Sequence, residues 1–242
     1  MSGAAQMLEF AGEIGIRVTH SLPEGSPLKP GATVLRGQGK PEQIARAEEM
    51  ILGAIGKPSG VASASERFVR AAGGRVKIVC GAWKKVAPQV RKELRQAIAV
   101  GGAGIRITDE PFVYLDKNYV RMLGGVRQAV EKGRELAGRI IVVQLRGEEM
   151  PLELEAEVAV QAGAGILMVD TGREEDLAAV VGRAKRRGWR EKVKIAFAGG
   201  VTLEAVPRLA AAGADILDVG RCIIDAPLLD FRLEVGPSEE MG

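Results

Sequence analysis

Two apolar segments in the C-terminal third of the chain each end in glycine, a pattern typical of phosphate binding. The segment KVKIAFA runs into Gly199 and Gly200, and DILDVG ends at Gly220, directly before Arg221. Glycine loops that follow parallel strands allow backbone N–H groups to hold a phosphate, and an arginine adds positive charge. A tight turn without a ligand is the alternative interpretation of the same residues.

Polar residues also follow the other apolar segments. Asp170 ends GILMVD, and its carboxylate either caps the next helix or faces a binding site. Gln144 in RIIVVQL has a similar position but cannot act as a base. Further charged residues stand at or near the ends of the remaining segments: Lys84, Lys85, Arg106, Asp116 and Lys117. Together they predict a cationic site for an anionic ligand, although each one singly is typical of an ordinary surface charge.

Metal and thiol chemistry receive little support from the sequence. His20 is the single histidine, so neither histidine catalysis nor a histidine metal site is indicated. The two cysteines, Cys80 and Cys222, lie in or beside apolar segments and are expected to be buried thiols.

Composition limits the class of protein. The chain has 242 residues, 46% of them apolar and 27% charged, which fits one large α/β domain with a small addition. No apolar run reaches the length of a membrane span and the start does not resemble a signal peptide, so we expect a cytoplasmic protein without membrane contact. Basic residues gather at 182–192, where a helix C-terminus is favoured over a nucleic-acid surface.

The elements that must position these residues alternate between strand and helix. From about Arg75, strands are predicted at VKIVCG, AGIRIT, FVYLD, RIIVVQL, GILMVD, KVKIAFA and DILDVG, with helical segments between most of them. This order predicts an α/β fold with a parallel (β/α) barrel, complete or incomplete. A doubly wound open sheet is the alternative, but no G-x-G-x-x-G turn follows the first strand.

A weak internal repeat supports the barrel. The segments GGAGIRITD, AGAGILMVD and AGADILDVG each end a helix with glycine and begin a strand two residues later. These copies mark one face of the barrel, so the functional residues are expected at the opposite ends of the strands. Thr202 is predicted to cap the helix that follows Gly200.

The N-terminal part differs in character from the rest. Turn-rich short strands precede a helix predicted from about Pro41 to Ile55, which together indicate a small α+β, sandwich-like domain. The chain is expected to open in the middle of a sheet, whose free edge would need a partner strand or subunit. We therefore divide the chain into an α+β domain at 1–70, a barrel at 71–235 and a tail at 236–242.

Several motifs together resemble the quinolinate phosphoribosyltransferases, also called carboxylating nicotinate-nucleotide pyrophosphorylases. The stretch from LPEGSPLKPGATVLRGQGK onward is similar to GxxVxPGxxLxxxxGxxxxLLxxER in that family, with Glu48 at the glutamate of ER. AGGVTLE is similar to the SGGI phosphate loop. The most specific match is ILDVGRCIIDAPLLDFRLEV to ISVGxLTHSxPALDxSL, which shares Gly220, Pro227 and Asp230.

The resemblance implies a homodimer with a small α/β sandwich and a partly open barrel, here as a member with a short N-terminus. It also implies the joining of a pyridine dicarboxylate to phosphoribosyl pyrophosphate, with loss of carbon dioxide and pyrophosphate and with Mg²⁺ bound to the pyrophosphate. By motif, the residues of the family's 5-phosphate site correspond to Gly199, Gly200 and Gly220. The family's carboxylate lands on Asp170 and the arginine of its NHR motif on Arg106.

Other motif positions differ from the family pattern. The family motif DTRKT corresponds to AWKKV in this chain, so Lys84 stands in place of the arginine and Lys85 matches the family's lysine. At position 84 a point charge therefore replaces a planar bidentate group. KDNH becomes DKNY, with Tyr119 in place of histidine and with lysine and aspartate exchanged at Asp116 and Lys117. The NHR histidine becomes Ile105, and the barrel glutamate becomes Gln144. These changes concentrate in the pocket for the ring and its carboxylates, so we predict an altered aromatic-acid substrate.

Three hypotheses remain. The first is a phosphoribosyltransferase with Lys85, Asp170 and Lys117 as catalytic residues, in which Lys84 and Lys85 neutralise departing pyrophosphate and Arg106 orients a substrate carboxylate. The second is a non-catalytic paralogue that binds a nucleotide or sugar phosphate. The third is a different sugar-phosphate barrel enzyme, such as an isomerase or aldolase, in which Lys85 or Lys117 forms a Schiff base or donates a proton. Lys84, Arg106, Asp116, Gln144, Gly199, Gly200, Gly220 and Arg221 are the predicted substrate-binding residues.

Overall fold

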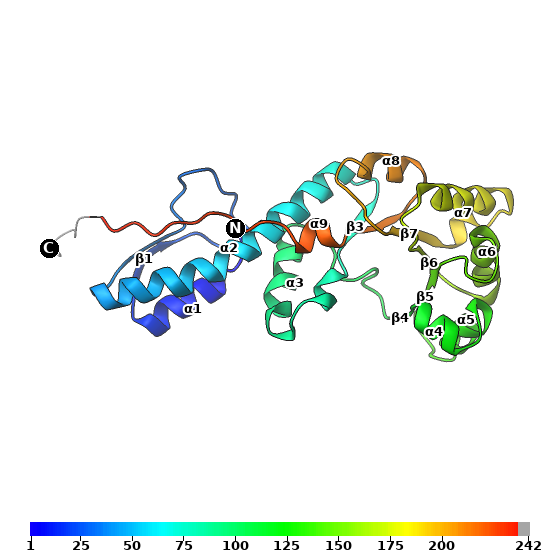
Figure 1. The fold of residues 1–242 in the computed structure, drawn as a ribbon, viewed down its shortest axis with the longest axis horizontal. Coiled ribbons are helices and arrows are strands. Elements are labelled where there is room, and N and C mark those ends of the chain that lie inside the picture. The colour runs from blue at the N-terminus through cyan, green and yellow to red at the C-terminus, as the bar shows by residue number, and fades with distance from the viewer. Residues whose placement is uncertain (237–242) are drawn as a thin grey trace.

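One long helix, α2 (Pro41–Ala72), joins the two parts of an elongated molecule (Figure 1). The computed structural model describes residues 1–236, so most of the predicted tail at 236–242 lies outside the described residues. The helix was predicted only as far as Ile55. It continues because its small residues from Gly56 to Ser65, which resemble a turn in the sequence, are mostly buried against other parts of the chain.

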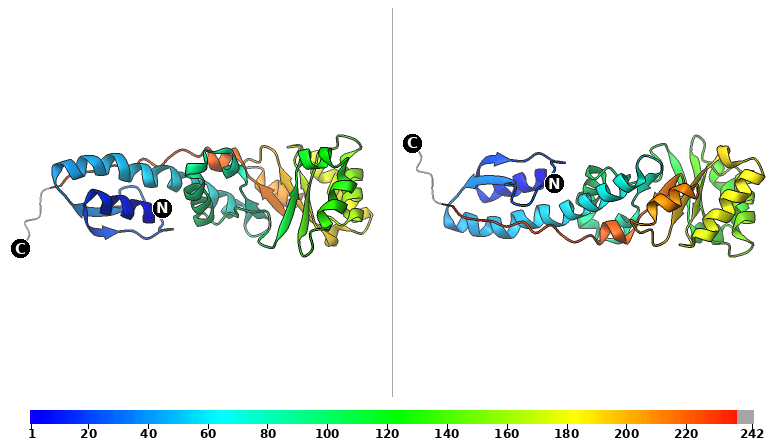
Figure 2. Two further views of the ribbon diagram at one scale, coloured as in Figure 1. Left: turned by 90° about the horizontal axis from the view of Figure 1, so that it is seen from below. Right: turned by 90° about the horizontal axis from the view of Figure 1, so that it is seen from above.

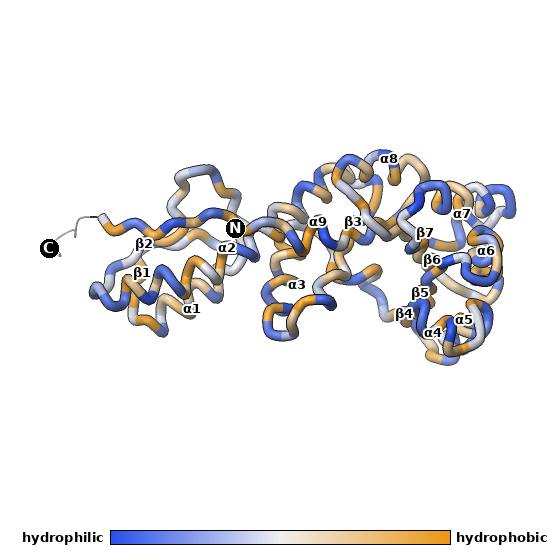
Figure 3. Tube along the Cα trace, in the orientation of Figure 1, coloured by the Kyte–Doolittle hydropathy of each residue, from blue (hydrophilic) through white to orange (hydrophobic). Residues whose placement is uncertain are grey.

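The N-terminal part consists of a helix, a two-stranded sheet and the first half of α2. α1 (Ala4–Ile14) is followed by β1 (Arg17–Ser21) and β2 (Leu35–Gln38), which pair antiparallel. α1 and α2 bury their apolar faces in a separate small core, and hydrophobic and hydrophilic residues alternate along both helices in Figure 3.

The chain opens with this helix, so the prediction that it opens in the middle of a sheet is wrong. The Glu24 carboxylate accepts hydrogen bonds from the backbone N–H groups of Gly3 and Ala4, at 3.0 and 2.7 Å, and from the Ser2 hydroxyl at 2.7 Å. A residue from the following loop thereby caps the first turn of α1, a contact that the apolar pattern of residues 4–14 could not reveal.

The larger part is built on a six-stranded parallel sheet, which confirms the predicted α/β class. The strands are β3 (Lys77–Val79), β4 (Phe112–Leu115), β5 (Ile140–Leu145), β6 (Ile166–Val169), β7 (Lys194–Ala198) and β8 (Ile216–Asp218). Their order is β3-β8-β7-β6-β5-β4, with β3 and β4 at the two edges, and the sheet forms an incomplete barrel.

The barrel is open on one side because the predicted strand AGIRIT does not form. In this segment a single bridge pairs Gly104 with Val79 of β3, and the chain then bends through residues 105–107. Within residues 1–236, β4 pairs with β5 alone. Glycine weakens extended pairing, and Gly102 and Gly104 flank the start of this segment.

Helices and short 3-10 turns connect the strands. They are η1 (Ala82–Lys85), η2 (Pro88–Val90), α3 (Arg91–Val100), α4 (Lys117–Met122), α5 (Val126–Arg134), α6 (Leu152–Ala162), α7 (Glu174–Arg186), η3 (Arg190–Lys192), α8 (Val206–Ala211) and α9 (Arg221–Ile224). The last turn of α7 carries basic residues, as predicted for a helix C-terminus. Thr202 does not cap the next helix: α8 begins four residues later, where Pro207 favours the first helical turn.

Glycines of the internal repeat end helices on the predicted face of the barrel. Gly163 and Gly213 have φ angles of +106° and +103°, the left-handed conformation of helix C-caps. In the first copy the positive φ falls on Gly102 rather than Gly101. The carboxyl ends of the strands therefore lie at the opposite face, where the site was expected.

The C-terminal segment leaves the barrel and runs back along α2 to the N-terminal part (Figure 2). The Lys57 ammonium donates to the carbonyl of Ala226 at 2.6 Å, and the Leu229 N–H donates to the carbonyl of Gly56 at 3.0 Å. Phe231 and Leu233 then pack against the small N-terminal core. The C-terminal segment thus helps to hold the two parts together.

The two cysteines have different surroundings. Cys80 is buried, and burial raises the pKa of its thiol to about 12. Cys222 is exposed, so the prediction that it is buried is wrong. It lies on the short helix α9, which turns this side chain away from the apolar residues beside it in the sequence. Within residues 1–236, no helix combines the length and apolar character needed to cross a membrane.

Candidate active site

Strand alternation brings a set of polar side chains to the inside of the barrel at its carboxyl end. Val142, Ile166 and Ala196 form part of the interior core cluster, whereas their sequence neighbours pack toward the surrounding helices. With a period of two residues, the inward positions at the carboxyl ends of the strands are occupied by Asp116, Gln144, Asp170 and Asp218.

Gln144 links two of these carboxyl ends. Its side-chain Oε1 accepts a hydrogen bond from the Lys117 backbone N–H at 2.7 Å, and its Nε2 donates to Oδ2 of Asp170. The residue is buried. An amide can donate and accept at once, so it holds the start of α4 and the carboxylate of Asp170 in fixed positions.

Asp170 faces the site rather than capping a helix. α7, the next helix, has Arg173 at its N-cap. Arg146 Nη1 lies 3.5 Å from Asp170 Oδ2 and 2.9 Å from its carbonyl oxygen. Of the two roles that the sequence allowed for Asp170, the structure therefore shows the one in the barrel mouth, where the carboxylate is half-buried.

The two lysines of AWKKV lie on η1, immediately after β3. Lys84 Nζ is 5.6 Å from the centre of the Tyr114 ring, which forms part of the barrel interior. Burial, reinforced by the charge of Asp218, raises the pKa of the Tyr114 hydroxyl. The phenol is therefore a neutral wall of the site at physiological pH.

Asp218 is a site residue that we did not single out from the sequence. Its Oδ1 accepts a hydrogen bond from the Gly81 N–H at 2.9 Å. Burial raises the pKa of the carboxyl group, while that N–H and the charges of Lys84 and Lys85 oppose the rise. The available signal was the alternation in DILDVG, where Asp218 has the same parity as the inward Ile216.

The paired glycines after β7 pack against the loop after β6. Gly199 and Gly200 have φ angles of +106° and +76°, which favour glycine. A Cβ on Gly199 would lie 2.6 Å from the backbone N of Gly172, and the N–H of Gly172 donates to the carbonyl of Ala198 at 3.1 Å. Gly172 was also missed by sequence reasoning, although TGREE after Asp170 carries the same glycine signal.

Gly220 and Arg221 follow β8, at the same end of the barrel. The carbonyl of Gly220 accepts hydrogen bonds from the N–H groups of Ile223 and Ile224, both at 3.2 Å, and Arg221 begins α9 with an exposed side chain. The loops after β7 and β8 are adjacent because these two strands pair.

Three predicted residues lie nearer the rim. Asp116 caps α4, since its Oδ1 accepts hydrogen bonds from the backbone N–H groups of Asn118 and Tyr119 at 2.8 and 3.1 Å. Lys117 begins that helix and is exposed. Arg106 is exposed in the loop after Gly104, next to Ile105, whose carbonyl accepts a hydrogen bond from Trp83 of η1 at 3.2 Å. The loop of Arg106 therefore lies beside the loop of Lys84 and Lys85.

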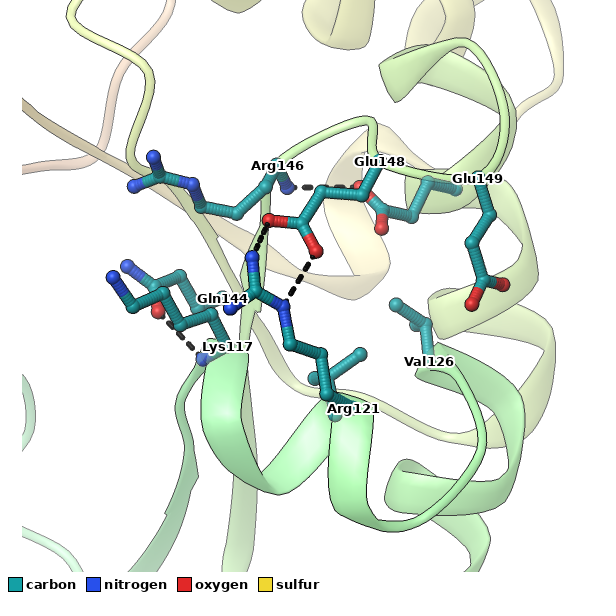
Figure 4. A pocket seen from close by; sticks show the side chains of 9 residues that line it. Lys117, Arg121, Val126, Gln144, Arg146, Glu148 and Glu149 are labelled. Carbon is teal, nitrogen blue, oxygen red and sulfur yellow. Dashed lines mark hydrogen bonds and ion pairs between the residues drawn. The ribbon is translucent and has the colours of Figure 1, made fainter.

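A small pocket adjoins Gln144 on the side of α4 (Figure 4). Arg121 and Glu148 close one wall through a two-point contact in which Arg121 Nε donates to Glu148 Oε2 at 2.8 Å; this contact lowers the pKa of the Glu148 carboxyl. Glu155 supports the loop after β5, because its Oε2 accepts hydrogen bonds from the N–H groups of Arg146 and Gly147 at 2.9 and 2.8 Å. Burial raises the pKa of Glu155.

The site offers few ligands for a metal held by protein alone. Among residues 1–236, no group of three or more histidine, cysteine or acidic side chains is placed to hold an ion. Mg²⁺ is usually bound through one or two carboxylates together with substrate phosphates. The half-buried carboxylate of Asp170 fits that mode.

The arrangement combines exposed glycine loops, cationic side chains and inward carboxylates around an apolar floor. Such a site suits a ligand that has a phosphate at one end and a charged or aromatic group at the other. No histidine contributes, because His20 lies on β1 in the N-terminal part.

Comparison with known proteins agrees with this geometry. The sequence profile of the quinolinate phosphoribosyl transferase C-terminal domain matches residues 61–234, and that of the N-terminal domain matches residues 1–59. A probable nicotinate-nucleotide pyrophosphorylase (carboxylating) of Archaeoglobus fulgidus is 32% identical over 222 residues, covering 91% of this chain and 84% of that protein. The nicotinate-nucleotide pyrophosphorylase (carboxylating) of Homo sapiens is 30% identical over 230 residues, covering 94% and 75%.

Solved structures share the fold. The nicotinate-nucleotide pyrophosphorylase of Francisella tularensis superimposes with a TM-score of 0.76 at 23% identity, covering 93% of this chain and 78% of that one. The likeness extends over both the N-terminal part and the barrel.

Proposed function

The chain belongs to the quinolinate phosphoribosyl transferase family, and on that premise we propose that it transfers a phosphoribosyl group from phosphoribosyl pyrophosphate to the ring nitrogen of an aromatic acid. The observation that carries this proposal is the pair of adjacent glycine loops after β7 and β8, next to Asp170 and at the same barrel end as Lys84 and Lys85. In this proposal the phosphate group binds at the glycine loops, and the ring binds at the mouth of the barrel.

In the transfer step, the ring nitrogen donates its lone pair to C1 of the ribose, and the bond from C1 to pyrophosphate breaks with its electrons leaving on pyrophosphate. Positive charge develops on the ribose in the transition state, and the half-buried carboxylate of Asp170 stabilises it. Lys84 and Lys85 neutralise the departing pyrophosphate. With quinolinate as substrate, the bond from C2 to its carboxylate then breaks, carbon dioxide leaves, and the electron pair at C2 takes up a proton.

Asp170 would hold Mg²⁺ that arrives bound to pyrophosphate, and the ion would supply charge neutralisation there. Gln144 keeps the Asp170 carboxylate in place through its Nε2. Lys117 contributes its backbone N–H to the same network, and its side chain is available at the rim.

The proposal includes an aromatic acid different from quinolinate. Two of the departures from the family motifs, Lys84 and Gln144, lie inside the barrel mouth. Tyr119 is 51% exposed on α4, so its difference from the family pattern is not expected to touch the ring.

Calorimetry with phosphoribosyl pyrophosphate and Mg²⁺, followed by addition of quinolinate and assays for pyrophosphate and nicotinate mononucleotide, tests this function. Binding with pyrophosphate release on addition of an aromatic acid is the expected result. Release with quinolinate as the best acid would contradict the altered substrate but support the transfer. Binding without release for any aromatic acid would favour a non-catalytic paralogue, and no binding would contradict the proposal.

A homodimer in the cytoplasm completes the proposal. The family resemblance supports the dimer, and the free thiols of Cys80 and Cys222 suit a reducing compartment. Light scattering of the purified chain should give twice the monomer mass of 25.6 kDa; a monomer at micromolar concentration would contradict the dimer.

A further inference from the structure

Asp218 lies inside the barrel but has no part in the transfer step described above. Asp218 of β8 pairs with Ala198 of the neighbouring strand β7. On the other side of β7, Ala196 pairs with Met168 of β6. The inward residues of β7 are therefore the small Ala196 and Ala198. Asp170, at the end of β6, lies beyond them. On β7, between β6 and β8, the small residues Ala196 and Ala198 therefore separate the inward carboxylates of Asp170 and Asp218.

The carboxylate of Asp218 is only partly used by the protein. Oδ1 accepts the hydrogen bond from Gly81, but within residues 1–236 no donor hydrogen-bonds to Oδ2. Lys84 and Lys85 act on Asp218 electrostatically, yet in the same part of the chain no ion pair joins either lysine to it. One oxygen is therefore free to accept a hydrogen bond from a ligand.

The surroundings are acidic on one side and aromatic on another. The negative charges of Asp218, Asp170 and Asp116 all raise the pKa of the Tyr114 hydroxyl, and Lys84 Nζ lies 5.6 Å from the centre of the same ring. A second carboxylate on a ring bound here would meet like charge, which costs binding free energy. A donor group at the same position would instead satisfy Asp218.

We propose that Asp218 is a specificity-determining residue whose free oxygen accepts a hydrogen bond from an N–H or O–H substituent of the aromatic acid. The second substrate is then a heteroaromatic monoacid that carries such a donor, in preference to a dicarboxylic acid. This inference rests on the proposed function. With this substrate, transfer forms the bond between ring nitrogen and C1 and releases pyrophosphate with its electron pair, and no carbon dioxide is lost.

Binding of three acids to the full chain tests the assignment. The probes are pyridine-2,3-dicarboxylate, pyridine-3-carboxylate and 2-aminopyridine-3-carboxylate, measured by calorimetry in parallel with phosphoribosyl pyrophosphate and Mg²⁺. The variant Asp218→Asn removes the charge but keeps an acceptor for the Gly81 N–H. Asp218→Ser is a second variant, and Asp225→Asn is a control for charge at an exposed position outside the barrel interior.

We expect the wild type to bind 2-aminopyridine-3-carboxylate at least about tenfold more tightly than pyridine-2,3-dicarboxylate. Both Asp218 variants should shift that ratio toward the dicarboxylate by about tenfold or more, and Asp225→Asn should leave it unchanged. Equal binding of the two acids, an unchanged ratio in both Asp218 variants, or no binding of any acid would overturn the inference. In the first two of those cases, retained binding of phosphoribosyl pyrophosphate would leave the proposed function standing. Its retention without binding of any acid would favour a non-catalytic paralogue, and its loss in the wild type would remove the proposed function.

Discussion

The side chain of Gln144 donates a hydrogen bond to the carboxylate of Asp170, which joins the carboxyl ends of β5 and β6 inside the barrel. The same amide accepts the N–H of Lys117 from the start of α4. Three segments that approach one another only in the folded chain are thereby fixed by one buried polar group.

Replacement of Gln144 by leucine should weaken both the site and the fold. The Lys117 N–H loses its acceptor, which we expect to lower the free energy of unfolding by about 1–3 kcal/mol. Asp170 is left with Arg146 alone, and misplacement of a reacting group lowers kcat/KM by about tenfold to a hundredfold. Urea unfolding and pyrophosphate release measure the two effects. Gln128→Leu at an exposed position of α5 is the control, and equal behaviour of the two variants would contradict the role of Gln144.

Alanine at Gly199 should abolish tight binding of phosphoribosyl pyrophosphate. The added Cβ would lie 2.6 Å from the backbone N of Gly172, so the loops after β6 and β7 must separate. At Gly200 a Cβ meets nothing within 4 Å, and only the positive φ is unfavourable, at about 1 kcal/mol. Calorimetry should therefore show a loss of at least about tenfold for Gly199→Ala and a smaller loss for Gly200→Ala. The reverse order would show that the approach of Gly172 to Gly199 does not shape the phosphate site.

Asp218 gives the fold a specific dependence on pH. Its pKa is raised in the folded state by burial, so the protonated form stabilises the fold. That contribution is complete below the ordinary carboxyl pKa and is lost as pH rises through the raised value. Relative to Asp218→Asn, the wild type should lose stability from about pH 4 upward. Unfolding midpoints of both proteins between about pH 4 and 7 test this; a constant difference across that range would show that Asp218 does not titrate differently on folding.

Two glycines of α2 should respond in opposite directions to alanine. A Cβ on Gly60 would lie 1.9 Å from the carbonyl oxygen of Pro227, so the returning C-terminal segment must move, at a cost of about 1–3 kcal/mol. A Cβ on the exposed Gly53 meets nothing within 4 Å, and alanine there should stabilise the helix by about 0.5–1 kcal/mol. Thermal unfolding compares the two variants, and proteolysis near residue 230 reports release of the segment. A neutral Gly60→Ala would contradict the close contact.

The structure places the residues predicted from local pattern at the carboxyl ends of the strands, where the site was expected. Gly199, Gly200 and Asp170 follow strands that alternation and composition identify in the sequence. Asp218 and Gly172 were missed because each matters through a partner distant in sequence, Gly81 for the first and Gly199 for the second. The catalytic and binding roles assigned to individual residues remain predictions.

The sequence by itself determined the parallel α/β class, most strands, the glycine C-caps and the resemblance to one enzyme family. The class, the strands and the C-caps arise from the two-residue period of strands and from the conformational freedom of glycine, both of which are local properties. The family resemblance comes from short motifs such as AGGVTLE and ILDVGRCIIDAPLLDFRLEV. The tertiary structure decided where the barrel stays open, how far α2 extends, and which carboxylates meet inside. Those outcomes depend on the packing of segments far apart in the chain. Burial against a surface distant in sequence sets both the length of an element and the contacts of each side chain.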